Sequence, residues 1–173
     1  MAYFDENVLR DTQLLDDSGN LNDAGKELLA HLLKNLPLFH KGRWGEAFMP
    51  LMSRCVPACV ELVIVRDGKV LLCHRKDEFF DGWHTPGTYI GPGESFQEAA
   101  QRCADREIKA QVRVIKCIAS FLNNDNPRFS DLSNLLYCEI TGNPQNGTWF
   151  QKCPPDLIPV HRKFWPVIEP YLT

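Results

Sequence analysis

A glycine- and proline-rich loop at positions 85–94 runs directly into a strong helix start, and this junction restricts the fold more than any other stretch. Ser95 and Glu98 form an S-x-x-E capping box, in which the serine caps the Glu98 backbone N–H and the glutamate reaches back. The helix that follows carries more charge than its small apolar stripe requires. A loop of backbone donors and carbonyls leading into such a helix is suited to holding a hard cation against a polyphosphate.

Apolar stretches on both sides of this junction predict β-strands. They cover 56–67, 68–76, 112–122 and 133–141. Asp67-Gly68 between the first two is a strong hairpin signal. The tail predicts a closing helix over 159–172, interrupted near Pro166. Mostly antiparallel strands with two or three helices packed on them indicate an α+β fold or an α/β/α sandwich.

The first part of the chain has a different pattern, and we expect it to form a helical N-terminal extension (1–54) packed on a core domain (55–173). A helix over 24–36, capped by Asn22 or Asp23 and ended by Pro37, places its leucines on one face. A shorter helix around 7–15 is also expected. The aromatic segment 39–51 either covers the core, contacts a second copy or lines a pocket, and packing is the reading we favour.

Composition and charge narrow the function classes. A net charge of −3 and a pI near 5.9 provide no basic field for nucleic acid. No run of 18 apolar residues occurs and the N-terminus lacks a signal-peptide pattern, so we expect a cytoplasmic protein with no membrane partner. The seven cysteines contain no C-x-x-C pair, which favours reduced, structural thiols.

The junction and its surroundings resemble the Nudix hydrolases. The family's box is matched by Gly93-Glu94-Ser95, by Glu98-Ala99-Ala100 and by Arg102 at the required distance from Glu94. The resemblance covers about 56 to 172 and implies an α/β/α sandwich with a mixed sheet. It also implies a divalent-metal hydrolase of a nucleoside diphosphate linked to another moiety, allows a homodimer, and makes Glu94 and Arg102 a structural loop-to-helix ion pair.

The departures from the family pattern fall on the residues that hold the metal. Cys103 and Arg106 stand where the box has glutamates, so only Glu107 of the three carboxylates remains. With the Gly87 carbonyl, which faces the metal in this family, Glu107 can hold at most one weakly bound Mg²⁺ or Mn²⁺ ion. A unit positive charge on Arg106 at about 6 Å repels such an ion by about 5 kcal/mol at an effective dielectric near 20, before salt screening.

Reduced boxes of this kind resemble the GDP-mannose mannosyl hydrolases, which keep the glutamate at position 107 and use one ion. That resemblance makes Gln145 a candidate third ligand, although the histidine that accompanies this glutamine in the subgroup is absent here. No general base is therefore specified. Asp131, in the polar loop at 123–131, is a candidate for activating water.

The remaining candidate site residues each have a structural alternative. Arg75 and Arg128 either contact phosphates or are surface charges, and Trp83 either stacks on a base or enters the core. Two functions stay open: a hydrolase with a single Mg²⁺ or Mn²⁺ ion, and a catalytically impaired nucleotide- or metabolite-binding protein in which Arg106 contacts phosphate directly. A cation beside Gly87 and Glu107 would favour the hydrolase, whereas Arg106 in that position would favour the binding protein.

Overall fold

A computed structural model describes residues 13–42 and 44–172, which form two compact units divided between Trp44 and Gly45. In the first unit, helix α2 (Asp23–Asn35) has the expected cap, because the Asn22 side chain accepts a hydrogen bond from the Gly25 N–H at 2.9 Å. Four leucines of α2 expose between 39% and 54% of their surface. The expected helix around 7–15 lies mostly outside the described residues, and packing of the extension on the core stays a prediction.

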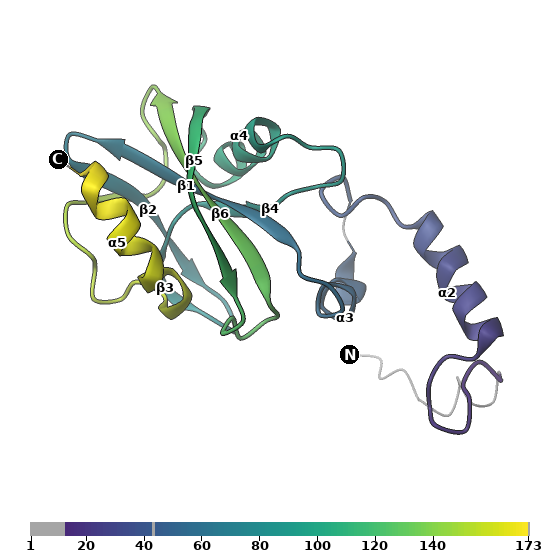
Figure 1. The fold of residues 1–173 in the computed structure, drawn as a ribbon. Helices are drawn as coiled ribbons and strands as arrows, with labels where there is room; N and C mark the ends of the chain where they lie inside the picture. Colours follow the sequence, from purple (N-terminus) through teal and green to yellow (C-terminus); the bar gives the residue numbers. More distant parts are fainter. Residues whose placement is uncertain (1–12, 43, 173) are drawn as a thin grey trace. The chain divides into compact units, whose positions relative to one another are not determined.

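The second unit is built on a seven-stranded sheet (Figure 1). Its strands are β1 (Ala58–Arg66), β2 (Lys69–Lys76), β3 (Asp81–His84), β4 (Gly87–Tyr89), β5 (Gln111–Asn123), β6 (Asp131–Thr141) and β7 (Thr148–Phe150). The main order is β3-β2-β1-β6-β5, with β4 paired to β1 and β7 to β2. Only the β1–β6 pair is parallel among these pairings, so the sheet is mixed, as the family resemblance implies.

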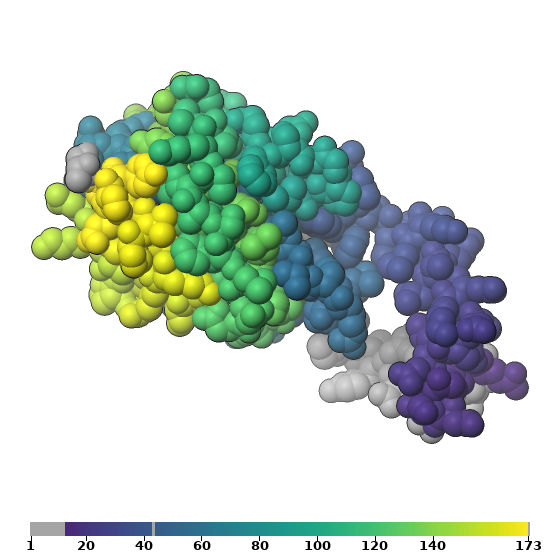
Figure 2. Space-filling view, viewed as in Figure 1, coloured from purple at the N-terminus to yellow at the C-terminus, as the bar shows by residue number. Residues whose placement is uncertain are grey.

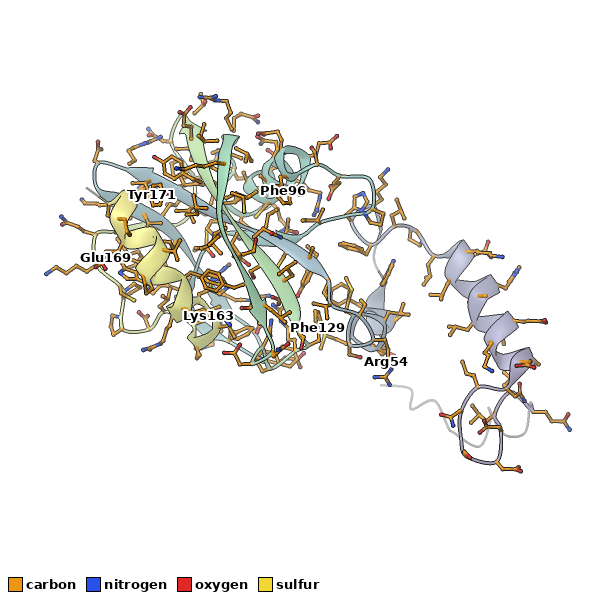
Figure 3. The ribbon with its side chains drawn as sticks, viewed as in Figure 1. Arg54, Phe96, Phe129, Lys163, Glu169 and Tyr171 are labelled. Atoms are coloured by element: carbon orange, nitrogen blue, oxygen red, sulfur yellow. The ribbon has the colours of Figure 1, made fainter. Side chains whose placement is uncertain are left out.

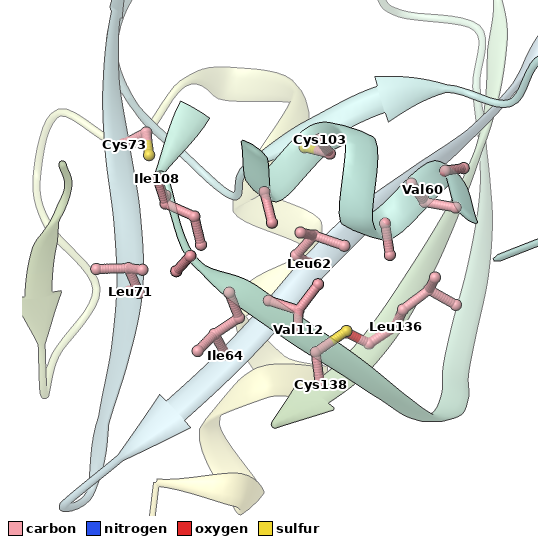
Figure 4. Packing of buried hydrophobic residues seen from close by; sticks show 14 residues of the cluster. Val60, Leu62, Ile64, Leu71, Cys73, Cys103, Ile108, Val112, Leu136 and Cys138 are labelled. Atoms are coloured by element: carbon pink, nitrogen blue, oxygen red, sulfur yellow. The ribbon is translucent and has the colours of Figure 1, made fainter. Parts of the chain in front are cut away.

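Helices cover both faces of this sheet, which makes the unit an α/β/α sandwich. On one face, α4 (Phe96–Glu107) packs on the even-numbered residues of β1, including Val60 and Leu62 (Figure 4). On the other face, Val63 packs against the C-terminal segment, whose yellow atoms lie beside green atoms of the sheet region in Figure 2. The alternation along β1 follows from the two-residue period of a strand.

The structure confirms one local detail of the sequence prediction and differs from it in others. The Asp67-Gly68 hairpin forms, with both residues at positive φ (50° and 67°). The closing helix is broken into the 3-10 helix η2 (Pro159–Phe164), the α-helix α5 (Trp165–Ile168) and the 3-10 helix η3 (Glu169–Tyr171). Prolines near the start of each piece lack the backbone N–H that would continue the helix. Two stretches read as loops contain the short strands β3 and β4.

Two glutamines of α4 attach the helix to the sheet edge. Gln97 donates to the Val112 carbonyl and accepts from the Val114 N–H, both at 2.8 Å. Gln101 donates to the Ala110 carbonyl at 3.1 Å and accepts from the Val112 N–H at 3.0 Å. Their side-chain amides thus replace a neighbouring strand along the start of β5.

A 3-10 helix, η1 (Gly45–Ala47), and a short α-helix, α3 (Phe48–Met52), precede β1. Within 13–42 and 44–172, no helix has the length and apolar character needed to cross a membrane.

Candidate functional site

The loop before α4 is held by the expected ion pair. Arg102 Nε and Nη2 each donate to one oxygen of the Glu94 carboxylate at 2.7 Å, and Nη2 also donates to the Tyr89 carbonyl at 2.7 Å. The Glu94 side chain is only 12% exposed. Bidentate arginine–carboxylate pairs fix geometry strongly. The pair therefore sets the path of the loop from β4 to Ser95, whose capping box with Glu98 is complete.

Arg106 lies between the two oxygens that the family resemblance assigns to a metal. Its Nη2 atom donates to the Gly87 carbonyl oxygen at 3.1 Å and to Glu107 Oε1 at 2.7 Å. The Arg106 side chain is 57% exposed, so the guanidinium joins the site from its solvent side. A monovalent cation that belongs to the chain thus contacts both Gly87 and Glu107.

The residues around this position do not match a divalent ion while Arg106 contacts them. Cys103, which replaces a box glutamate, is fully buried in the core beneath α4. Gln145 is exposed, and its backbone N–H donates to the Ile108 carbonyl at 2.9 Å. Among the described residues, no group of three or more His, Cys, Asp or Glu side chains could hold a metal. One feature remains open to a ligand: Glu107 Oε2 is buried without a hydrogen-bond partner.

Glu61, which the sequence analysis did not single out, is the buried acid of the site. It lies on β1, is 7% exposed, and its Oε2 accepts a hydrogen bond from Thr85 Oγ1 at 2.6 Å. A Cβ atom on Gly87 would come within 2.5 Å of the same oxygen, so the glycine leaves the space that this carboxyl group fills. In the sequence, the sign of this buried acid is that Glu61 is the one charged residue within the apolar run CVELVIV (59–65).

His161, from η2, completes this buried cluster. Its Nδ1 atom accepts the Thr85 backbone N–H at 3.2 Å and therefore carries no proton, so the ring is neutral. Its Nε2 atom is 3.9 Å from Glu61 Oε1, too far for a hydrogen bond. Burial lowers the pKa of His161 well below its usual value, and the neighbouring His84 and Arg75 charges lower it further.

Burial likewise raises the pKa of Glu61 well above its usual value. The Thr85 hydrogen bond opposes this shift, whereas the nearby carboxylates of Glu107 and Asp131 increase it. Both shifts favour the neutral form of each group, and Glu61 and His161 approach each other without a hydrogen bond between them. The two groups are joined through Thr85, whose hydroxyl donates to Glu61 and whose backbone N–H donates to His161.

We predict that Glu61→Gln changes the pH dependence of stability. Above about pH 4.3 the unfolded chain ionises Glu61 while the folded chain does not, so wild-type stability falls as pH rises toward the folded pKa. The glutamine variant lacks this loss, and its stability relative to wild type should rise by about 1.4 kcal/mol per pH unit in that range. Urea unfolding between about pH 5 and pH 8 measures it. Parallel profiles for the two proteins would mean that Glu61 is ionised when folded.

Arg75 and Arg128 lie beside the same aromatic ring. Their Cζ atoms are 5.6 and 5.4 Å from the centroid of Phe80. Arg75 Nε also donates to Asp77 at 2.5 Å, whereas Arg128 Nε is buried without a partner. Burial lowers the pKa of His84, and both arginine charges lower it further while Glu107 raises it. Both arginines and Glu107 therefore act on one histidine next to Thr85.

Asp131 is the first residue of β6 and is 4% exposed. Its carboxylate accepts hydrogen bonds from Asn123 Nδ2 at 2.5 Å, from Asn126 Nδ2 at 2.6 Å and from Ser133 Oγ at 3.4 Å. These contacts tie the base of the β5–β6 loop. Asp131 is close enough to raise the pKa of Glu61, but its role as a base stays a prediction.

Trp83 packs within the C-terminal side of the core. Its ring is edge-on to Phe150 (4.9 Å between centroids) and to His74 (5.1 Å). A separate aromatic group joins α3 to the site: Phe48, Tyr89 and Phe129 have centroids 5.8–6.2 Å apart. Base stacking by Trp83 stays a prediction, and Tyr89 and Phe129 form a second aromatic surface next to Arg128.

These elements define a class of fold: a mixed sheet between helical layers, with an ion-paired loop leading into a charged helix beside a buried polar cluster. The family model described as NUDIX domain matches residues 57–169. The chain belongs to the Nudix family. No curated protein sequence is significantly similar to it.

Solved structures with the same fold are distant in sequence. The Escherichia coli ORF135 protein has a TM-score of 0.54 and 23% identity, covering 68% of this chain and 89% of that one. An ADP-ribose pyrophosphatase from Streptococcus suis has a TM-score of 0.55 and 17% identity, covering 68% and 92%. A UDP-X diphosphatase has a TM-score of 0.56 and 16% identity, covering 94% and 75%. This last similarity extends into residues before 45.

Proposed function

We propose that this Nudix domain binds a nucleoside diphosphate linked to another group, and that Arg106 takes the place of the family's metal ion. The single observation that carries the proposal is the Arg106 guanidinium, which contacts both the Gly87 carbonyl and the Glu107 carboxylate. The same guanidinium is 57% exposed, so a phosphate can reach it.

The chemistry of arginine suits this role. A guanidinium presents five N–H donors in a planar fork, and only Nη2 is used at short distance by Gly87 and Glu107. The remaining donors can bind a phosphate directly, while Glu107 fixes the orientation of the fork. Arg75 and Arg128 add positive charge near His84. A doubly charged diphosphate would thus meet three arginines in place of a divalent ion, of which Arg75 is already paired with Asp77.

The ligand class comes from the family and from two structural neighbours. Those neighbours carry the names ADP-ribose pyrophosphatase and UDP-X diphosphatase, and both names describe nucleoside diphosphates linked to a further group. Identities of 17% and 16% support the fold, and we extend the ligand class to this chain as part of the proposal.

Ligand binding in the absence of divalent metal tests whether Arg106 takes the place of the ion. We expect ADP-ribose or a nucleotide sugar to raise the thermal unfolding midpoint equally in EDTA and in millimolar Mg²⁺. Arg106→Gln should weaken binding by about tenfold or more, because it removes a charge-assisted phosphate contact. Lys116→Gln is the matched control, since Lys116 lies on β5 over the Tyr171 ring, two strands away from β1.

A second candidate is hydrolysis with one Mg²⁺ or Mn²⁺ ion at Gly87 and Glu107. The buried, unpartnered Glu107 Oε2 favours it, since a hard cation would satisfy that oxygen. Arg106 must then leave both oxygens. Turnover that requires Mg²⁺ and is abolished by Glu107→Gln would establish this candidate and contradict the metal-independent one. A cytoplasmic location and a homodimer stay predictions for either function.

A further inference from the structure

A surface hollow of about 340 Å³ lies next to the site, between the residues that follow α3 (53–56) and the end of the β5–β6 loop (128–130). Arg54 and Phe129, labelled in Figure 3, belong to its two sides. Phe129 is buried and contacts Tyr89, so the inner wall of the hollow is part of the same aromatic surface that borders the site.

The hollow has two positive charges and no acid of its own. Arg54 and Arg128 both line it, and neither forms an ion pair within the described parts of the chain. Arg128 Nε is buried without a hydrogen-bond acceptor. A buried donor on a charged group costs free energy unless it is satisfied, so the described residues neither satisfy this atom nor neutralise the Arg128 charge.

Arg128 connects the hollow to the diphosphate site. Its guanidinium lies 5.4 Å from the centroid of Phe80, and Arg75 lies 5.6 Å from the same centroid. If the phosphates of a ligand lie at Arg75, a linked group that reaches Arg128 enters the hollow that Arg128 shares with Arg54. Val56 and Phe129 offer apolar contact on the way, as ligand pockets commonly do.

We propose that this hollow binds an anionic substituent, a carboxylate or a phosphate, carried by the group that is linked to the diphosphate. Arg54 and Arg128 are its specificity-determining residues. The inference rests on the proposed function, because it places the distal part of the same ligand.

UDP-glucuronate and UDP-glucose test it, since they differ by a carboxylate in place of a hydroxymethyl group. At equal ionic strength, calorimetry should show UDP-glucuronate binding about tenfold more tightly to the wild type. Arg54→Gln should reduce this preference to within about twofold of equality, whereas Lys116→Gln should retain it. Equal affinities in the wild type, or a preference that Arg54→Gln leaves intact, would overturn the proposal.

Inorganic phosphate separates this inference from the proposed function. We expect phosphate to raise the thermal unfolding midpoint of the wild type more than that of Arg54→Gln. If neither of these sugar nucleotides nor ADP-ribose binds, the proposed function fails, and the phosphate titration alone decides whether the hollow is an anion site. Equal stabilisation of the two proteins by phosphate would then exclude it.

Discussion

Arg106→Glu should convert the site from an arginine-filled one into a divalent-ion site. The change removes the cation that contacts Gly87 and Glu107 and adds a second carboxylate one residue from Glu107. A unit charge at about 6 Å is worth about 5 kcal/mol against a divalent ion before screening. About a quarter of that amount would already strengthen Mn²⁺ binding tenfold. Electron paramagnetic resonance of free Mn²⁺ measures the affinity directly.

Lys116→Glu is the control for this experiment, because it makes the same charge change on β5. We expect it to alter Mn²⁺ affinity by less than about twofold, since exposed charges beyond a Debye length are screened. The same Arg106→Glu protein should lose metal-independent nucleotide binding. If Mn²⁺ bound no better to Arg106→Glu than to the wild type, Arg106 would not be what excludes the ion.

Gly87→Ala should destabilise the protein by about 2 kcal/mol, the range found for overpacking a buried site. The φ angle of Gly87 is one that alanine also adopts, so the expected loss of stability comes from the steric clash of the added methyl group. The added Cβ would meet both oxygens and Cδ of Glu61 at 2.5–2.8 Å and would displace the carboxyl group from Thr85. Urea unfolding of the purified variant measures the loss.

The double variant Gly87→Ala/Glu61→Ala supplies the stricter test. Removing the Glu61 carboxyl group vacates the space that the new methyl group needs, so the two changes should be non-additive by at least about 1 kcal/mol. Additive losses would show that the carboxyl group does not restrict Gly87, and the account of why glycine stands at this position would be wrong.

The parts of the fold that depend on residues close together in the chain were predictable from the sequence. Asn22, the Ser95–Glu98 capping box and the Asp67-Gly68 turn act within a few residues, and all three form as expected. The box pattern also located the Glu94–Arg102 ion pair. The interacting residues of each feature lie within eight positions of one another in the chain, which is why a single sequence reveals them.

The buried cluster of Glu61, Thr85 and His161 could not be predicted from the sequence in the same way. Glu61 and His161 are a hundred positions apart, and only the packing of η2 against the sheet brings them to Thr85. The sequence analysis anticipated Arg106 as a charge pressing on Glu107. It left open which way the side chain points, and the structure shows it reaching the Gly87 carbonyl. Side-chain direction at an exposed helix position depends on partners that lie outside the helix.

The glutamine attachments of α4 have a consequence for aggregation. An unpaired sheet edge is a template on which other chains can add strands. Gln97 and Gln101 hydrogen-bond to the Ala110 carbonyl just before β5 and to backbone groups of Val112 and Val114 within it, and register shifts further along the strand disturb its regularity. The helix that carries Arg106 and Glu107 therefore also protects the start of β5, the edge strand, from pairing with other chains. Local unfolding of α4 would remove the ligand site and uncover the edge in one event, so loss of binding and the onset of aggregation should coincide on heating.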